Sequence, residues 1–183
     1  MLRPRLYGNR NFSFLLIVRQ QASEHLQATS SGELKYGITL GPAIRNINRE
    51  DLRPCGNEQC KRTIPLRFAL CNLPEVLTIG IVWDTSNSGV DYIWEVMNLI
   101  DHTVKVEDMF DSVLQSGTYT LRGMITYYGL HYNAYFRNPK SNDWLVFDDA
   151  RVNKVGSTWQ DVIAKCLSGR WQPSVLWYEY TSS

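Results

Sequence analysis

Hydrophobic and polar positions change their spacing along the chain, and each spacing predicts a different element. From Glu75 to Trp83 the apolar residues are nearly continuous and often β-branched, which is typical of a buried strand. Residues 119–127 alternate between apolar and polar side chains and predict a strand with one polar face. Apolar residues three and four positions apart predict two helices, at 90–97 and 157–169. A last strand follows Pro173.

Each of the two helices is expected to bury one apolar stripe. The motif Ser-Thr-Trp-Gln, Ser157 to Gln160, predicts a capping box at the start of the second helix, and Gly169 predicts its end. The stripes are Val90, Ile93, Trp94 and Met97 in the first helix, and Trp159, Val162, Ile163, Cys166 and Leu167 in the second.

One stretch has the pattern of a β-hairpin that brings a histidine near a carboxylate. A strand rich in Tyr and Phe runs from His131 to Arg137, turn-forming residues follow, and apolar residues resume at Trp144. If Arg137 pairs with Trp144, His131 and Asp148 share a face as diagonal neighbours, roughly 7–8 Å apart at the backbone. Asp149 would then point to the other face, and a shift of one residue in register would exchange the two aspartates.

Hairpins with helices between them predict an α+β fold with a mostly antiparallel sheet and flanking helices. A chain of 183 residues is long enough for one domain with a real core. The first 20 residues differ from the rest, because they hold four arginines, no acidic residue and the run Phe-Ser-Phe-Leu-Leu-Ile-Val. Arg19 follows this run directly and no cleavage motif comes next, so we expect a strand or a divergent extension rather than a targeting signal. Polar residues continue to Ser31, which divides the chain into 1–31 and 32–183.

Charge and motifs argue against several classes of function. Nineteen basic and 18 acidic residues give a net charge of +1, so composition does not indicate nucleic-acid binding. The chain has neither a phosphate-binding loop nor a dinucleotide-binding fingerprint, and we expect no cofactor. No apolar stretch approaches the length of about 20 residues that crosses a membrane, so we expect no membrane association. Four cysteines without a dense framework are typical of a reducing compartment, the cytoplasm or the nucleus.

The predicted pair of His131 and Asp148 has a recognised chemistry. A carboxylate bonded to one ring nitrogen fixes the imidazole tautomer and stabilises its protonated form, so the other nitrogen can act as a general base. The alternative is a surface histidine near two solvated aspartates, which is the commoner outcome of such spacing.

A longer stretch around this histidine resembles the C-terminal His box of the ubiquitin-specific proteases, the papain-like cysteine deubiquitinases. The sequences that carry the likeness are YTLRGMITYYGLHYNAYFRN and DWLVFDDARV. In that family a strand leads into Gly-X-His-Tyr or Gly-His-Tyr, and an aromatic strand and Trp-x-x-Phe-Asp-Asp follow. The matching residues here are Gly129, His131, Tyr132, Trp144, Phe147, Asp148 and Asp149. The segments LPEVLTIGIVWD and WQDVIAKCLSGRWQPSVLWYE also resemble the subgroup of ubiquitin carboxyl-terminal hydrolases 53 and 54, often described as inactive.

The likeness covers roughly residues 51–180 and implies a role for each matched position. His131 would be the general base and Asp148 its orienting partner, with Asp149 as the second candidate carboxylate. The fold would be the palm portion of the protease without the thumb that carries its Cys box. Leu130 stands where many active relatives have glycine, and its bulk is expected to crowd the channel for the Gly-Gly tail of ubiquitin. The residues expected to line that channel are Gly129, Leu130 and Tyr132.

The family's nucleophile is a cysteine in a Gly-Asn-x-Cys box followed by a helix, and no such box precedes His131. A thiol protease needs a cysteine whose pKa is lowered by a nearby histidine and a helix N-terminus. Cys166 lies in the apolar stripe of a predicted helix and Cys71 in an apolar run, so we expect both to be packed. Cys55 and Cys60 lie in a polar loop with no apolar helix after it. The chain alone is therefore expected to be inactive.

Cys55 and Cys60 also raise the question of a metal. Many relatives hold structural zinc with two cysteine pairs on a fingers subdomain, and such a site needs four ligands. This chain offers one pair, and neither His25 nor His102 has a ligand-like spacing to it. We expect a relic half-site and no bound metal.

Three interpretations remain open at this point. The chain is a C-terminal piece of a deubiquitinase, or a pseudoenzyme whose palm binds ubiquitin as an adaptor, or an interaction scaffold that inherited the His–Asp pair. The first two predict ubiquitin or ubiquitinated proteins as the partner, and the third predicts neither.

Overall fold

The computed structural model describes residues 17–19, 39–83 and 88–181. Most of the predicted extension at 1–31, including His25, lies outside these residues. The strands of the large sheet are β1 (Ile17–Arg19), β5 (Val76–Val82), β6 (Thr103–Lys105), β8 (Thr118–Tyr128), β9 (His131–Arg137), β10 (Trp144–Asp148), β11 (Arg151–Gly156) and β12 (Gln172–Thr181). Two small sheets contain β2 (Leu52–Pro54) with β3 (Thr63–Pro65), and β4 (Ala69–Leu70) with β7 (Ser112–Val113). The helices are α2 (Leu40–Glu50), α3 (Val90–Leu99), α4 (Val106–Met109) and α5 (Trp159–Gly169).

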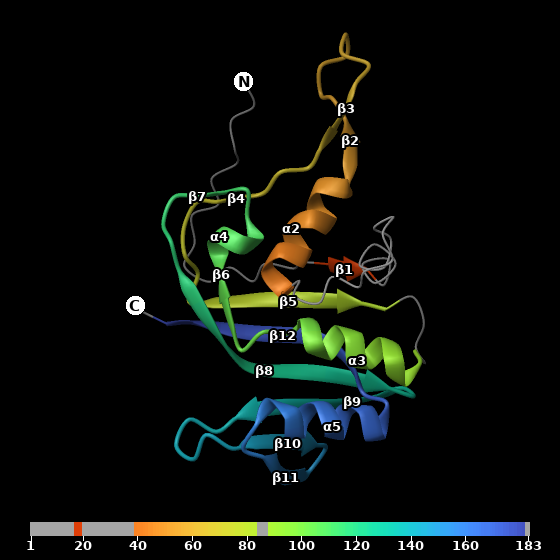
Figure 1. Cartoon of the computed structure of the whole chain (residues 1–183), viewed down its shortest axis with the longest axis vertical. Helices are drawn as coiled ribbons and strands as arrows, with labels where there is room; N and C mark the ends of the chain where they lie inside the picture. The colour runs from red at the N-terminus through yellow and green to blue at the C-terminus, as the bar shows by residue number, and fades with distance from the viewer. Residues whose placement is uncertain (1–16, 20–38, 84–87, 182–183) are drawn as a thin grey trace, which may run out of the picture.

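The large sheet has the order β1-β5-β12-β8-β9-β10-β11, with β6 paired to β8, and β11 is its last strand. Only β1 and β5 pair in parallel, and the other pairings of this sheet are antiparallel. The predicted α+β class with a mostly antiparallel sheet is confirmed. Helices α3 and α5 lie next to each other against one face of the sheet, while the β2–β3 hairpin extends beyond α2, away from the sheet (Figure 1).

The capping box of α5 lies one residue later than predicted. Thr158, not Ser157, is the N-cap: its hydroxyl accepts from Asp161 N at 3.2 Å, and the Asp161 carboxylate accepts from Thr158 N at 2.9 Å. The Ser157 hydroxyl instead donates to Asp143 at 2.7 Å. A carboxylate three residues after Thr158 closes the box, and the Gln160 amide is not needed.

The two predicted helical stripes are buried to different extents. Val162 and Cys166 are fully buried in α5, while Trp159, Ile163 and Leu167 pack against the core from its border. In α3 only Ile93 and Met97 are fully buried, whereas Trp94 is 49% exposed. The predicted helix is present, but Val90 is also 37% exposed, so only a narrow row of residues, four positions apart, packs on the sheet.

The face of the sheet opposite the helices carries an aromatic row that depends on a glycine. Phe136 stacks on Trp177 at 5.4 Å between ring centroids, with an angle of 14° between the planes. Gly123 lies between their strands, paired with both residues. A Cβ at position 123 would overlap the Phe136 ring and lie 2.7 Å from the carbonyl oxygen of Tyr135. Between these rings, position 123 therefore has room only for glycine.

Among the residues that the structure describes, no helix combines the length and the apolar character needed to cross a bilayer.

Gly123→Ala should reduce the free energy of unfolding by roughly 1–3 kcal/mol, because the added methyl group displaces a ring in a packed row. Urea denaturation monitored by tryptophan fluorescence measures the change. Gly56→Ala is the matched control, since a Cβ at position 56 meets nothing within 4 Å. Equal midpoints for the two variants would show that the row adapts to the extra carbon.

Candidate functional site

The β8–β9 hairpin closes through a two-residue turn. Tyr128 pairs with His131, so only Gly129 and Leu130 connect the strands, with φ values of 56° and 71°. Two consecutive positive φ values are typical of a type I′ turn. Glycine adopts this conformation readily, whereas a leucine there costs roughly 1–2 kcal/mol. The turn makes His131 the first residue of β9 and leaves Leu130 90% exposed.

The register of β9 against β10 is the one that the sequence predicts. Trp144 pairs with Arg137, and the pairing continues to Phe147 opposite Ala134. The strand β10 ends at Asp148, one residue further on. His131 and Asp148 therefore share the face of the sheet that packs against α5, as diagonal neighbours.

His131 and Asp148 are joined by a hydrogen bond of 2.6 Å between Nε2 and Oδ1. Their side chains are 40% and 44% exposed, so solvent reaches both groups. The imidazole also lies against the Trp171 ring, with 5.8 Å between centroids. Since Asp148 occupies Nε2, the nitrogen left to exchange a proton with another group is Nδ1.

Asp149 lies closer to this pair than predicted. One ligand-type atom each of His131, Asp148 and Asp149 lies within 4.8 Å of the others. The expectation that Asp149 points away was wrong, because the strand ends at Asp148 and Asp149 takes a left-handed conformation with φ of 49°. The cluster of one imidazole and two carboxylates is the only group of three or more potential metal ligands among the described residues, and it contains no thiol.

The surroundings of the imidazole raise the pKa of His131 above its ordinary value of 6.5. The hydrogen bond that the imidazole donates to Asp148 is the main cause, and the negative charges of Asp148 and Asp149 add to it. His102 shows the opposite behaviour. Burial lowers its pKa, and the nearby charge of Arg137 lowers it further.

Asn133 is a buried polar residue that the sequence did not single out. Its side chain is on the same face as His131, and the residue is only 4% exposed. When its amide nitrogen faces the acceptors, it donates to Asp148 Oδ1 at 3.1 Å and to Tyr132 O at 3.3 Å. The Asn133 amide thus fixes the position of the Asp148 carboxylate, which in turn fixes the His131 imidazole. The predicted register places Asp148 opposite Asn133. That placement could have identified Asn133 as a partner of the carboxylate.

The residues expected to contact a ubiquitin tail lie around the turn but on two faces. Tyr132 follows His131 in β9 and therefore projects from the opposite face of the sheet. Tyr132 is 61% exposed, and its ring packs on that of Tyr127 at 4.8 Å between centroids. The structure thus gathers His131 and both aspartates on one side, with Tyr132 on the other and the Gly129–Leu130 turn between them.

The four cysteines lie elsewhere. Cys166 is fully buried in α5, and burial raises its pKa to about 12, in keeping with the expected packing role. Cys71 follows β4 and is partly exposed. Cys55 and Cys60 lie on the β2–β3 hairpin.

A groove of about 570 Å³ runs from the site along α5. It lies between this helix and the β10–β11 hairpin, and Asp148 and Trp171 line the end next to His131. Lys154, Asp161 and Lys165 line its remaining length together with Val155 and Ala164, so its wall mixes charged and apolar side chains.

Comparison with known proteins assigns the family. The sequence model of the ubiquitin carboxyl-terminal hydrolases matches residues 14–178. The chain belongs to this family. Ubiquitin carboxyl-terminal hydrolase 54 of Rattus norvegicus is 41% identical over 145 residues, and ubiquitin carboxyl-terminal hydrolase 53 of Homo sapiens is 37% identical over 133 residues. The resemblance inferred from the His-box motifs, including that to this subgroup, is confirmed.

The alignments with these two relatives cover 76% and 70% of the chain but only 9% and 12% of the relatives. The chain thus spans about a tenth of the length of each. The fold agrees with that of a solved SAGA DUB module, Ubp8/Sgf11/Sus1/Sgf73 bound to monoubiquitin, with a TM-score of 0.51 at 15% identity. A second structure of that module gives a TM-score of 0.52 at 16% identity. These matches cover 81% of this chain and 34% and 32% of the solved chains, and they establish a ubiquitin hydrolase fold.

The pKa of His131 should lie above 6.5 and that of His102 below it, because a carboxylate stabilises the first imidazolium while burial and an arginine oppose the second. Asp148→Asn should lower the pKa of His131 markedly, and Asp149→Asn, which removes only a more distant charge, should lower it less. NMR titration of the imidazole resonances measures both values. Because the folded-state pKa is raised, the stability from this pair is fully present below pH 6.5 and disappears as the pH rises through the pKa of His131. A pH-independent difference in stability between wild type and Asp148→Asn would contradict this linkage.

Leu130→Gly should raise the free energy of unfolding by up to about 1 kcal/mol, because it removes a left-handed leucine and gives the turn a preferred residue. The entropy of the extra glycine in the unfolded chain offsets part of the gain. Leu114→Gly is the control: Leu114 is 73% exposed and its φ is not positive, so only the entropic loss applies. Chemical denaturation of the two variants should give changes of opposite sign.

Proposed function

We propose that the chain is the His-box half of a deubiquitinase catalytic domain, which binds the tail of ubiquitin and supplies the general base. The observation that carries this proposal is the 2.6 Å bond that fixes His131 on Asp148 beside the exposed turn. The family membership and the fold support the same conclusion.

The chemistry assigned to the site is acyl transfer to a thiol. His131 Nδ1 would accept the proton of a cysteine thiol, and the thiolate would attack the carbonyl carbon of the terminal glycine of ubiquitin. The imidazolium would then return the proton to the departing amine. Asp148 would stabilise the imidazolium in between, with Asn133 holding the carboxylate and Asp149 adding charge.

The thiol would have to come from outside this set of residues. The cluster around His131 contains no thiol, and Cys166 is buried with a raised pKa. A chain with this sequence alone is therefore assigned ubiquitin binding without hydrolysis, in the palm portion of the domain. A ubiquitin-binding adaptor of the same fold is the second candidate, favoured by that missing thiol. Four cysteines free of disulfides suit a reducing compartment, the cytoplasm or the nucleus.

The proposed contact with ubiquitin centres on Tyr132. An extended Leu-Arg-Gly-Gly tail is held partly by main-chain hydrogen bonds, and glycine alone fits beneath an aromatic ring. Tyr132 is 61% exposed and already supported by Tyr127, so it can cover such a tail without rearranging. Leu130 projects from the adjacent turn and would narrow the space through which the ubiquitin tail reaches Tyr132.

The test is an NMR titration of isotope-labelled ubiquitin with the folded chain. A palm without its thumb buries less than about 1,200 Å². We therefore expect a Kd of about 10⁻⁵ to 10⁻³ M, or roughly 4 to 7 kcal/mol. Tyr132→Ala should reduce the shifts of the ubiquitin tail more than His131→Ala does, because the ring supplies contact area. Tyr180→Ala removes a 37% exposed tyrosine of β12 and should leave the shifts unchanged.

Two results would contradict the proposal. No tail shifts at millimolar ubiquitin, with a chain that is folded by circular dichroism, would eliminate ubiquitin binding and leave the scaffold. A covalent adduct with a ubiquitin electrophile probe would show that one of the four cysteines serves as the nucleophile.

A further inference from the structure

The β2–β3 hairpin carries two cysteines in the loop that connects its strands. Cys55 directly follows β2, and its backbone N–H donates to Arg62 O at 2.9 Å. Cys60 N donates to Asn57 O at 2.8 Å, so the loop between them folds back on itself. The Asn57 side chain adds a bond of 3.0 Å from Gln59 N. The loop is thus held by its own hydrogen bonds, which keep the backbones of both cysteines at the same end of the hairpin.

The two cysteine side chains come within hydrogen-bonding reach of each other. Cys55 interacts with the backbone of Asn57 and with the thiol of Cys60 through hydrogen bonds, and both lower its pKa below the ordinary value. Hydrogen bonds to sulfur favour the thiolate, which is the reactive form of cysteine. Both residues are partly exposed, so a reagent in solution can reach them.

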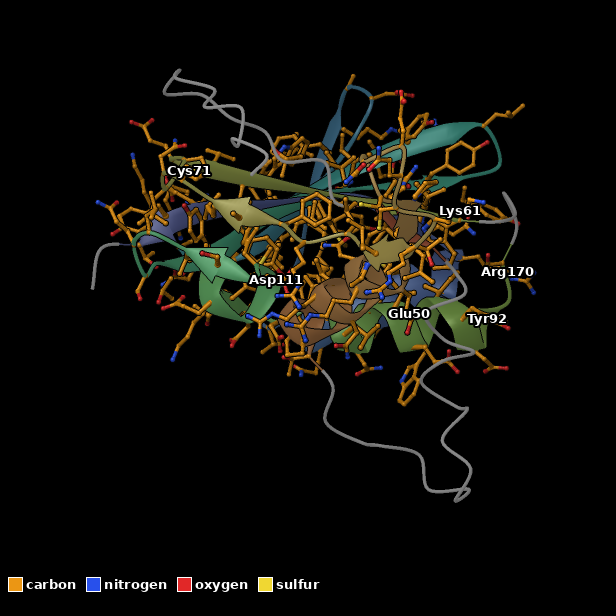
Figure 2. The ribbon with its side chains drawn as sticks, turned by 90° about the horizontal axis from the view of Figure 1, so that it is seen from above. Glu50, Lys61, Cys71, Tyr92, Asp111 and Arg170 are labelled. Carbon is orange, nitrogen blue, oxygen red and sulfur yellow. The ribbon has the colours of Figure 1, made fainter. Side chains whose placement is uncertain are left out.

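The charges around the pair are mixed, with a small excess of positive charge. Arg53, Lys61 and Arg62 are exposed and flank the two cysteines in sequence, while Arg53 is paired with Asp51 and Glu58 lies between the cysteines. The hairpin points away from the large sheet (Figure 1), and in the view along it Lys61 lies far from Cys71 (Figure 2). The pair is therefore separate from the other thiols, with Cys166 fully buried.

A metal is a poorer match for this pair than a disulfide. A structural zinc site needs four ligands, and the only group of three or more potential ligands in the described parts of the chain is the one around His131. Two thiols five positions apart in one hairpin can instead be oxidised to a disulfide with each other.

We propose that Cys55 and Cys60 form a redox-active dithiol that low-molecular-weight disulfides, such as glutathione disulfide, oxidise to an intramolecular disulfide. The Cys55 thiolate attacks one sulfur of glutathione disulfide, which forms a mixed disulfide and releases one glutathione thiolate. Cys60 then loses its proton to solvent and attacks the Cys55 sulfur, which releases the second glutathione thiolate. Two protein thiols are oxidised, and one glutathione disulfide is reduced to two glutathione molecules. This chemistry is independent of ubiquitin binding at His131.

The experiment exposes the full chain, purified under reducing conditions, to glutathione and glutathione disulfide at several ratios, followed by alkylation and peptide mass spectrometry. Wild type should lose two hydrogen atoms and yield a peptide that joins Cys55 to Cys60, while Cys71 and Cys166 remain alkylatable after unfolding. Cys60→Ser should accumulate glutathione on Cys55, because the resolving thiol is gone. Cys55→Ser should acquire several-fold less glutathione on Cys60. Cys71→Ser is the matched control and should form the disulfide like wild type.

Several outcomes would overturn the proposal. Thiols at 55 and 60 that stay reduced in wild type while glutathione modifies Cys71 would show that the pair is not reactive. Faster modification of Cys60 in Cys55→Ser than of Cys55 in Cys60→Ser would reverse the assigned roles. Purified chain that carries stoichiometric zinc on these thiols and resists oxidation until a chelator is added would make the pair a metal site. Peptide mapping of the wild-type chain alone shows whether Cys55 and Cys60 form a disulfide, even if a variant fails to fold.

Discussion

The antiparallel register of β9 against β10 determines what the site can do. With Arg137 opposite Trp144, alternate residues of the two strands turn toward the helices and are buried, among them Tyr135, Trp144 and Val146. Their burial fixes the register, since a shift of one residue would expose all three. His131 and Asp148 belong to the same alternating set, at the ends of the strands where the helix no longer covers them. The free energy that holds the core together thus also holds the imidazole on its carboxylate.

The same alternation separates the two parts of the proposed site. The groups proposed to handle the proton are on the helical face, with Asn133 buried beside Asp148, while Tyr132 stands on the open face next to Tyr127. The turn at Gly129 and Leu130 is where both faces meet solvent. Under the proposed function, a ubiquitin tail on Tyr132 would pass this turn, and the exposed Leu130, before its last carbonyl group reached His131. The groove beside α5 begins at the same end, behind Asp148.

The parts of the fold that the sequence predicted are those with a strong local pattern. The strand at 75–83, the β9–β10 hairpin and its register, and α5 were foreseeable because alternation, turn residues and a capping motif agree with one another. Asp149 was placed on the wrong face, because the alternation of faces stops at the end of the strand. Nothing in the sequence pattern predicts the left-handed backbone conformation of Asp149. Helix α2 was not predicted, because a Gly-Pro pair near its start is typical of a turn and its buried apolar residues, Leu40, Ala43 and Ile44, are confined to its first turns. The contact of Asn133 with Asp148 depends on burial, which spacing alone does not give.

The last strand of the sheet has a consequence for the behaviour of the chain in solution. β11 follows β10 and ends the order of the sheet, so one row of its backbone groups has no neighbouring strand within the described residues. Such a row can template the addition of a further strand from another molecule. Arg151 and Lys154 are exposed along it, and Lys154 is tied to Asp143 by an ion pair of 3.0 Å. Charged side chains along an unpaired border disfavour the pairing of the same strand from a second copy of the chain.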